Sequence, residues 1–306
     1  MYAIQRALKK YHWQYLFVLP MIILFLAFTV YPLLDSVRYT FYDWNGIGAP
    51  KDFVGFEHYI NITKDYFFWN AFKNTFIYTA VLVPIQLLLA LVLAVILNSR
   101  KLKAKNAFRG IFFSPVVTPP AIIGVVFVLL INTAGIDINK KLISLGLLER
   151  PIDLLGDPRT VLGVVIAIGI WIGLGYPMLY FLAALQSVNQ ELYDAARVDG
   201  AGNVALFWHI TLPMIRPILV IVFLLTTLHS LRVFDMVQVM TQGGPYFSSE
   251  VVGTYIYRYA FRINAVGDSD AALGYASAAA FYMGVVVMFI SLLQLFAGRF
   301  AVRERK

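Results

Sequence analysis

The stretch FIYTAVLVPIQLLLALVLAVIL at residues 76–97 decides the fold class of this chain. It contains no charged residue, and a helix of about 20 mostly apolar residues is long enough to cross the hydrocarbon core of a bilayer. Five further stretches meet the same requirement: Trp13–Leu34, Phe112–Ile131, Val161–Leu185, Ile218–Val237 and Tyr275–Phe296. The sequence therefore predicts an all-α, polytopic membrane protein with six transmembrane helices.

The composition of the whole chain supports the same class. Of its 306 residues, 60% are hydrophobic and only 14% are charged, whereas soluble domains contain about 25% charged residues. The net charge of +8 does not indicate a nucleic-acid partner, because the Lys and Arg residues lie at the ends of apolar runs. The absence of cysteine excludes disulfides and thiolate metal sites.

The first apolar run can be interpreted in two ways. Arg6, Lys9 and Lys10 precede it, as in a secretory signal peptide. Its length of about 22 residues and the lack of a small-residue cleavage site after it favour an uncleaved span. We therefore expect one N-terminal span in addition to a core of five spans.

The Lys and Arg residues also predict the orientation, because cytoplasmic segments of membrane proteins carry an excess of them. The excess lies before the first span, between the second and third spans, and after the last span. Both termini and the loop at residues 188–216 are therefore predicted to be cytoplasmic. The predicted divisions are residues 1–69 (tail, first span and outer loop), 70–297 (core domain) and 298–306 (basic tail).

No catalytic constellation stands out in the sequence. None of the four histidines has another His or Cys at metal-ligand spacing, and the chain has no phosphate-binding loop of the GxxxxGK[ST] type. We therefore expect neither an enzyme nor a cofactor or metal bound by this chain. A membrane enzyme that acts on a lipid-linked substrate would need an intramembrane acid or metal cluster, and none is present in the sequence.

The segment ELYDAARVDGA at residues 191–201 is polar and lies between two long apolar runs. It predicts a short helix at Gln190–Val198, with Asn189 as its N-cap and Gly200 as the left-handed residue after its end. A second short helix is expected at Val204–Ile210, stopped by Pro213.

The charge of this segment distinguishes between two roles for the first short helix. A helix that lies on the bilayer carries a polar face rich in Lys and Arg, whereas Glu191, Asp194 and Asp199 are acidic here. Docking onto a soluble partner is therefore favoured. The apolar face available for docking contains Leu192, Ala195, Ala196 and Val198.

One motif resembles the EAA loop of bacterial ABC-importer permeases. It is formed by Asp194-Ala195-Ala196, Asp199-Gly200-Ala201, Ile210-Thr-Leu-Pro213 and Pro217. That family usually has Glu where this chain has Asp194. The segments Phe108–Pro115, Leu231–Asp235 and Met240–Pro245 are similar to the larger permease of maltose-type sugar importers, and the resemblance covers about residues 70–297.

The resemblance implies a permease subunit in the inner membrane that moves a sugar or oligosaccharide by alternating access. Its expected partners are a second homologous permease, a dimer of ATPase subunits that bind ATP and Mg, and an extracytoplasmic solute-binding protein. The ATPase subunits are expected to grip Asp194, Ala195, Ala196, Asp199, Gly200 and Ala201. Gly243, Gly244 and Pro245 are expected to face the binding protein.

Polar and aromatic residues inside the spans are candidates for the substrate pathway. Thr226 and Ser230 share a helix face, and Trp171, Tyr176 and Tyr180 can stack on a sugar. The alternatives are hydroxyls bonded to their own helix, glycines that serve helix packing, and Trp171 as a core residue. Arg232 and Asp235 are expected to form an ion pair. If His229 and Arg232 face the cavity instead, an acidic sugar becomes a candidate substrate.

Two other functions stay open on the sequence. Within transport, the chain can belong to an importer of a glycerol phosphate or a polyamine. Outside transport, it can be a membrane enzyme or a structural scaffold, although a scaffold gives no reason for the patterned loop at residues 188–216.

Overall fold

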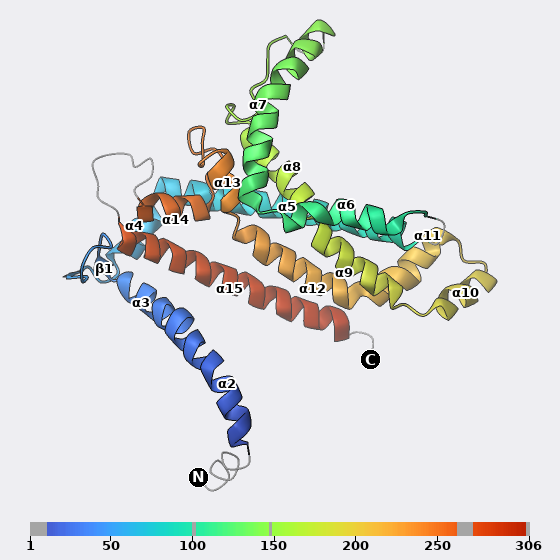
Figure 1. Cartoon of the computed structure of the whole chain (residues 1–306), viewed down its shortest axis with the longest axis horizontal. Helices are drawn as coiled ribbons and strands as arrows, with labels where there is room; N and C mark the ends of the chain where they lie inside the picture. The colour runs from blue at the N-terminus through green and yellow to red at the C-terminus, as the bar shows by residue number, and fades with distance from the viewer. Residues whose placement is uncertain (1–10, 100–101, 147–148, 262–271, 304–306) are drawn as a thin grey trace. The chain divides into compact units, whose positions relative to one another are not determined.

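The computed structural model describes residues 11–99, 102–146, 149–261 and 272–303, which are mainly helical (Figure 1). The chain begins with α2 (His12–Phe25), a π-helical turn η1 (Leu26–Val30), α3 (Tyr31–Tyr39), an antiparallel hairpin of β1 (Tyr42–Asp43) and β2 (Asp52–Phe53), and α4 (Glu57–Lys64). It continues with α5 (Tyr66–Asn98), α6 (Lys105–Val117), α7 (Pro120–Ser144), α8 (Val161–Gly173) and α9 (Gly175–Gln186). It ends with α10 (Gln190–Val198), α11 (Asn203–Leu206), a π-helical turn η2 (Phe207–Thr211), α12 (Leu212–Leu231), α13 (Asp235–Met240), α14 (Val252–Phe261) and α15 (Leu273–Arg303).

Several helices are long and apolar enough to cross a membrane. Within the described residues, five segments meet this test: Trp13–Tyr39, Tyr66–Asn98, Pro120–Ser144, Asn203–Met240 and Leu273–Gly298. The pair α8 and α9 adds a sixth candidate if the two helices, which are bent by 41° at their junction, form one span. The predicted polytopic helical class is confirmed, while the number of spans and the side of the termini stay predictions.

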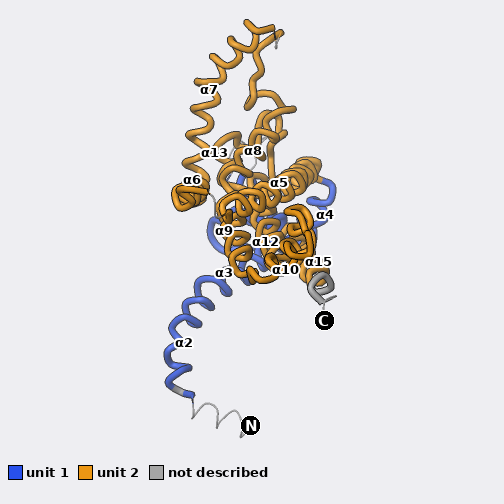
Figure 2. The backbone as a smooth tube through the Cα atoms, turned by 90° about the vertical axis from the view of Figure 1, so that its right-hand side faces the viewer, with its two compact units in different colours: residues 1–64, 256–282 blue, residues 65–255, 283–306 orange. Residues whose placement is uncertain are grey.

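The chain forms two compact units, residues 1–64 with 256–282 and residues 65–255 with 283–306 (Figure 2). In the larger unit α5 is the central helix, because it packs against α8, α9 and α12. One cluster of buried apolar side chains joins the first half of α5 to α7, α8 and α13, and a second joins its other half to α9 and α12. The domain limits predicted at residues 69 and 297 stay a prediction.

The smaller unit is built around a close backbone contact. Gly274 donates its N–H to the Trp44 carbonyl, and a Cβ at this position would lie only 2.0 Å from the Tyr42 carbonyl oxygen. The same Tyr42 oxygen is hydrogen-bonded to the ring of His58 at 3.0 Å. Only glycine allows this approach, so Gly274 fixes the hairpin against the start of α15.

The predicted third span, Phe112–Ile131, is wrong in its limits. Thr118 and Pro119 separate α6 from α7, and both have extended ψ angles, 132° and 130°. Each precedes a proline, and a residue before proline is disfavoured in the helical region. The candidate span is therefore Pro120–Ser144, and α6 is a separate helix.

Two prolines near helix starts, Pro32 and Pro213, do not break the helix, because a π-helical turn precedes each of them. The turn η1 ends just before Pro32 in the first turn of α3, and η2 ends just before Pro213 in the first turn of α12. A π-helical turn shifts the hydrogen-bond register, so that the missing N–H of proline is accommodated. The predicted stop at Pro213 is therefore wrong: α11, η2 and α12 run on as one helical segment.

The predicted fifth span, Ile218–Val237, lies within the longer candidate span Asn203–Met240. Its helix starts earlier, and α12 ends at Leu231, before the break that precedes α13.

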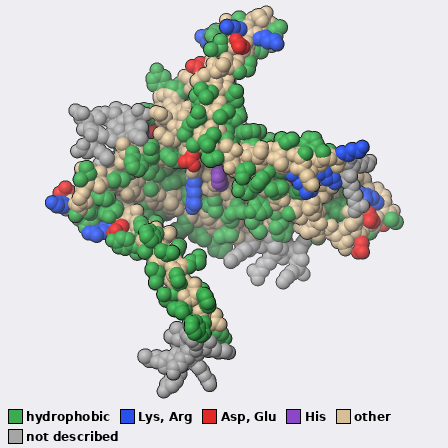
Figure 3. Space-filling model, viewed as in Figure 1, with side chains coloured by type: hydrophobic (Ala, Val, Ile, Leu, Met, Phe, Trp, Pro, Cys, Tyr) green, Lys and Arg blue, Asp and Glu red, His purple; other side chains and the backbone are tan. Residues whose placement is uncertain are grey.

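The segment at residues 132–160, between the predicted third and fourth spans, is not simply a loop, since α7 continues to Ser144. The side chain of Asn139 pairs with the backbone of Ile152 through two hydrogen bonds of 2.9 and 3.0 Å, which ties the returning chain to the helix. Charged side chains gather at the tip of this extension, above a largely hydrophobic stretch of α7 (Figure 3).

Candidate functional site

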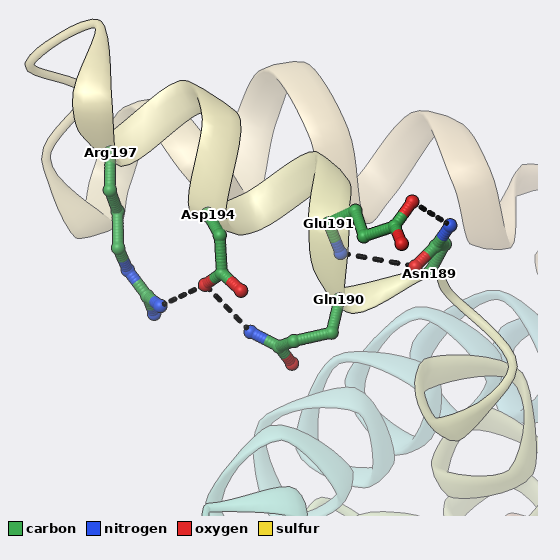
Figure 4. Close-up of polar contacts among 5 residues, drawn as sticks. All are labelled: Asn189, Gln190, Glu191, Asp194 and Arg197. Carbon is green, nitrogen blue, oxygen red and sulfur yellow. Dashed lines mark hydrogen bonds and ion pairs between the residues drawn. The ribbon is translucent and has the colours of Figure 1, made fainter.

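The helix α10 is capped as the sequence predicts. The Asn189 side-chain oxygen accepts the backbone N–H of Glu191 at 3.0 Å, and its amide donates to the Glu191 carboxylate at 3.1 Å (Figure 4). Asn189 therefore closes the first turn twice, through the N-cap bond and through a reciprocal side-chain bond. A helix of only nine residues depends on such caps because isolated short helices are marginal in water.

The C-terminal end of α10 is also fixed. Gly200 has a φ of +85°, donates to the Arg197 carbonyl at 3.0 Å, and is followed by Ala201, which donates to the Ala196 carbonyl at 2.9 Å. These two bonds form a Schellman motif, in which the residue after the C-cap adopts the left-handed conformation. The predicted role of Gly200 in ending the helix is confirmed.

The predicted docking face of α10 is exposed within this chain. Asp194, Ala195 and Asp199 are all exposed, and the side chains of Leu192 and Val198 are 43% and 88% exposed. Asp194 accepts hydrogen bonds from Arg197 at 3.3 Å and from Gln190 at 3.4 Å (Figure 4). Apolar and acidic side chains thus lie together on a surface that no other described part of the chain covers.

One residue that the sequence pattern did not reveal ties α10 to the start of α12. The hydroxyl of Tyr193 shares a hydrogen bond of 3.0 Å with the hydroxyl of Thr211. Thr211 is buried, and it donates to the Leu206 carbonyl at 3.2 Å. Thr211 immediately precedes α12, so this hydrogen bond joins α10 to the start of that helix.

The aromatic candidates for the substrate pathway lie on the surface of this chain. Trp171, Tyr176 and Tyr180 are 45%, 55% and 50% exposed. Trp171 of α8 contacts the ring of Phe127 with 5.5 Å between centroids, and Tyr176 of α9 contacts Phe113 edge-on at 5.6 Å. Tyr176 and Tyr180 are four residues apart and so share one face of α9.

The two hydroxyl side chains predicted to line the substrate pathway are buried, unlike the aromatic residues. Thr226 and Ser230 are buried within the chain, and the Ser230 hydroxyl donates to the Thr227 carbonyl at 2.9 Å in its own helix. Bonds of this kind are common for Ser and Thr in helices. In this conformation the structure does not place these two hydroxyls on the surface that carries the aromatic residues.

Two basic residues that are candidates for the substrate pathway lie at the C-terminal end of α12. His229 and Arg232, three residues apart, are exposed. The expected ion pair between Arg232 and Asp235 is wrong: in the part of the chain that the structure describes, no such pair forms. The helix breaks at Arg232, whose backbone lies outside the helical region (φ −103°, ψ 18°), and α13 starts only at Asp235. The expected ion pair needed both residues three positions apart in one continuous helix, and the break removes that geometry.

The segment from Gly243 to Glu250 is a loop whose carbonyls are hydrogen-bonded to side chains of α5. Asn74 of α5 donates to the carbonyls of Ser248 and Glu250 at 3.2 and 3.0 Å, and Asn70 donates to Phe247 at 2.7 Å. Gly243 is buried, whereas Gly244 and Pro245 are partly exposed.

Next to Pro245, Tyr246 is 89% exposed and has a φ of +49°. Left-handed tyrosines are uncommon and cost energy, so the loop holds an aromatic side chain away from its own core.

A resident metal site is not evident among the residues that the structure describes, since they contain no group of three or more His, Cys, Asp and Glu placed to bind one ion.

Comparison with known proteins gives consistent matches over nearly the whole chain. A family model described as "Binding-protein-dependent transport system inner membrane component" matches residues 86–302. The lactose transport system permease protein of Rhizobium radiobacter is 33% identical over 306 residues, covering 98% of each chain.

Two solved structures are similar in fold. A chain of a bacterial ABC transporter involved in the import of the acidic polysaccharide alginate is 26% identical with a TM-score of 0.80, covering 99% of this chain and 100% of that one. A chain of a bacterial alginate ABC transporter in complex with an alginate pentasaccharide-bound periplasmic protein is 25% identical with a TM-score of 0.79, covering 97% and 98%.

Proposed function

The chain belongs to the family of binding-protein-dependent transport system inner membrane components, and on that basis we propose that it imports a sugar or oligosaccharide as the permease subunit of an ABC importer. It is a multi-pass protein of the inner membrane and a transport subunit rather than an enzyme. ATP and Mg are then bound by separate ATPase subunits, and this chain holds no cofactor of its own.

The observation that carries the coupling part of the proposal is the exposed, doubly capped α10 with its Tyr193–Thr211 link. Two ATPase subunits that close on ATP would move α10 of this chain and the matching loop of a second, homologous permease. The hydrogen bond to Thr211 passes that movement to α12. Alternating access requires such a rigid-body movement around a site near the middle of the membrane.

The proposed substrate pathway follows the exposed aromatic residues Trp171, Tyr176 and Tyr180. Aromatic faces bury the apolar side of a sugar ring and leave its hydroxyls for hydrogen bonds. Thr226 and Ser230 remain candidates for a state in which α12 has moved, since both are buried in the described conformation.

The experiment that tests the coupling proposal uses two exposed ion pairs of the same i, i+3 type. Asp194 pairs with Arg197 in α10, and Asp137 pairs with Lys140 in α7. We expect Asp194→Arg to abolish assembly with the ATPase subunits and substrate-stimulated ATP hydrolysis, because it reverses the charge at the docking face. Asp137→Arg is the matched control and keeps both activities. Equal assembly of the two variants would contradict the proposal.

A solute-binding protein is the proposed partner of the loop that contains Gly243, Gly244 and Pro245. The related alginate transporter was crystallised with such a protein, and here Tyr246 is the side chain that this loop presents. We expect Tyr246→Ala to reduce the stimulation of ATP hydrolysis by the binding protein while basal hydrolysis is kept. Unchanged stimulation would exclude this loop from the contact.

An acidic saccharide is a second candidate substrate, favoured by the exposed His229 of α12 and the exposed Arg232 that follows this helix. A cation in a span faces protein or a wet cavity rather than lipid. With an acidic and a neutral oligosaccharide of equal length, Arg232→Gln is expected to reduce uptake of the acidic one selectively. An equal loss for both sugars would reject the acidic candidate.

A further inference from the structure

The bend between α8 and α9 leaves one backbone carbonyl without its usual partner. In an α-helix the carbonyl of residue i accepts from the N–H of residue i+4. For Gly173 that residue is Pro177, which has no N–H. The two helices meet here at 41°, so the Gly173 carbonyl lies at the hinge of a candidate membrane span.

A side chain from another helix supplies the missing donor. Gln86 of α5 is 5% exposed, and its amide donates a hydrogen bond to the Gly173 carbonyl. Two residues that are 87 positions apart in the chain therefore complete the backbone of the bend. Such a bond is valuable inside a membrane, because an unpaired carbonyl there has no water to replace it.

Two glycines of α8, Gly169 and Gly173, leave the space that the side chains of α5 occupy. A Cβ at Gly173 would lie 2.5 Å from the Gln86 amide nitrogen, and one at Gly169, a turn earlier, would lie 2.3 Å from the Tyr78 hydroxyl. Tyr78 and Gln86 are eight residues apart on α5, so they lie two turns apart on nearly the same face. The small-residue pair of α8 thus receives two large polar side chains of α5, a form of close packing typical of membrane helices.

We propose that Gln86 is a positioning residue for transport: it holds the bend by taking the place of the N–H that Pro177 lacks. The bend fixes how Trp171, two residues before Gly173, is directed relative to Tyr176 and Tyr180 after it. The inference rests on the proposed function, because these three residues are its candidate sugar contacts. Gln86 touches the backbone of the pathway helix, not the sugar.

A substitution at Pro177 tests this proposal, because it gives the Gly173 carbonyl a second possible hydrogen-bond donor. Pro177→Ala restores an N–H four residues after Gly173, which lets the helix close its own hydrogen bond and straighten. The two ways of satisfying the carbonyl are then a bent helix with Gln86 or a straight helix without it. When Gln86→Leu is added to Pro177→Ala, only the straight helix can pair the carbonyl, whereas Gln86→Leu alone leaves the carbonyl unpaired.

Three variants are compared with the unmodified chain in the assembled transporter: Gln86→Leu, Pro177→Ala and the double variant. Gln86→Leu is expected to lower the thermal stability of the complex and to reduce the uptake rate at least about fivefold. The double variant should regain the stability of Pro177→Ala alone, since its carbonyl is paired again, but it should not regain uptake. Gln294→Leu, which replaces a glutamine of a different helix, α15, is the control and should transport normally.

The angle can be measured without any substrate. Spin labels on cysteines at Gly163 and Gln186, both exposed, report the length across the bend in a chain that has no native cysteine. With about 1.5 Å of rise per residue, straightening lengthens this separation by about 2 Å. That increase is expected for the double variant and not for Gln294→Leu.

Two results would overturn the proposal. Unchanged stability and uptake in Gln86→Leu would show that the bond does not hold the bend, and full recovery of uptake in the double variant would show that the bend does not position the pathway. A failure of the proposed function looks different, since the unmodified transporter would then take up no sugar while the stability and spin-label results still hold.

Discussion

Replacing Gly200 by alanine is expected to weaken the docking of the ATPase subunits on α10. Gly200 has a φ of +85°, and a Cβ built there meets no atom within 4 Å. The substitution therefore creates no clash, and its cost is the backbone strain of an L-residue in the left-handed region, about 1–2 kcal/mol. At about 1.4 kcal/mol for each factor of ten, the capped loop becomes about 5–30 times less populated relative to the uncapped one.

The chain contains a matched control for this substitution. Gly202 lies two residues further on, has a φ of −75°, and also has open space around a Cβ. Gly202→Ala makes the same chemical change without strain.

The assay is a titration of the reconstituted permease pair with the ATPase subunit, followed by the rate of ATP hydrolysis. We expect the half-saturating concentration to rise by up to about 5–30-fold for Gly200→Ala, because only the capped loop docks. It should stay unchanged for Gly202→Ala. Identical curves for the two variants would refute the idea that the left-handed cap prepares α10 for its partner.

Three further predictions follow from the membrane part of the chain. Cysteines placed at Lys103 and Gly202 should be protected from impermeant thiol reagents in intact cells while one at Gly48 reacts, and labelling at Gly202 from outside would reverse the predicted orientation. Asn74→Leu removes the donor to the Ser248 and Glu250 carbonyls of the Gly243–Glu250 loop, at a cost of about 1–3 kcal/mol, so hydrogen exchange in residues 247–250 should increase; unchanged exchange would show that other contacts hold the loop. Trp171→Ala should reduce uptake without loss of assembly, and normal uptake would remove Trp171 from the pathway.

The sequence was informative wherever a local pattern determines the structure. Long apolar runs predict spans because every backbone group in a helix is paired within the segment, whatever lies around it. The caps of α10 were predictable for the same reason, since Asn189 and Gly200 act on neighbouring residues. Both features depend on contacts within about five positions of the chain.

The limits of the spans were less predictable, because proline has opposite effects in different contexts. Thr118-Pro119-Pro120 breaks a helix, whereas Pro213 is carried within one by the π-helical turn before it. Whether a π-helical turn forms depends on how the helix packs against its neighbours, and this cannot be inferred from the local sequence pattern. The outer extension of α7 was missed similarly, since Asn139 finds its partner only after the chain has turned back.

The contacts that organise the candidate site join distant residues, and α5 supplies several of the donors. Asn70 and Asn74 satisfy the carbonyls of the Gly243–Glu250 loop, and Gln86 satisfies the carbonyl at the bend between α8 and α9. Each irregular stretch has carbonyls that its own segment does not satisfy, and an amide side chain of α5 restores the pairing. Irregular backbone survives at membrane depth only when protein or water satisfies it. The central helix therefore does more than fill the core: its amide side chains pair the backbone where neighbouring segments bend and turn.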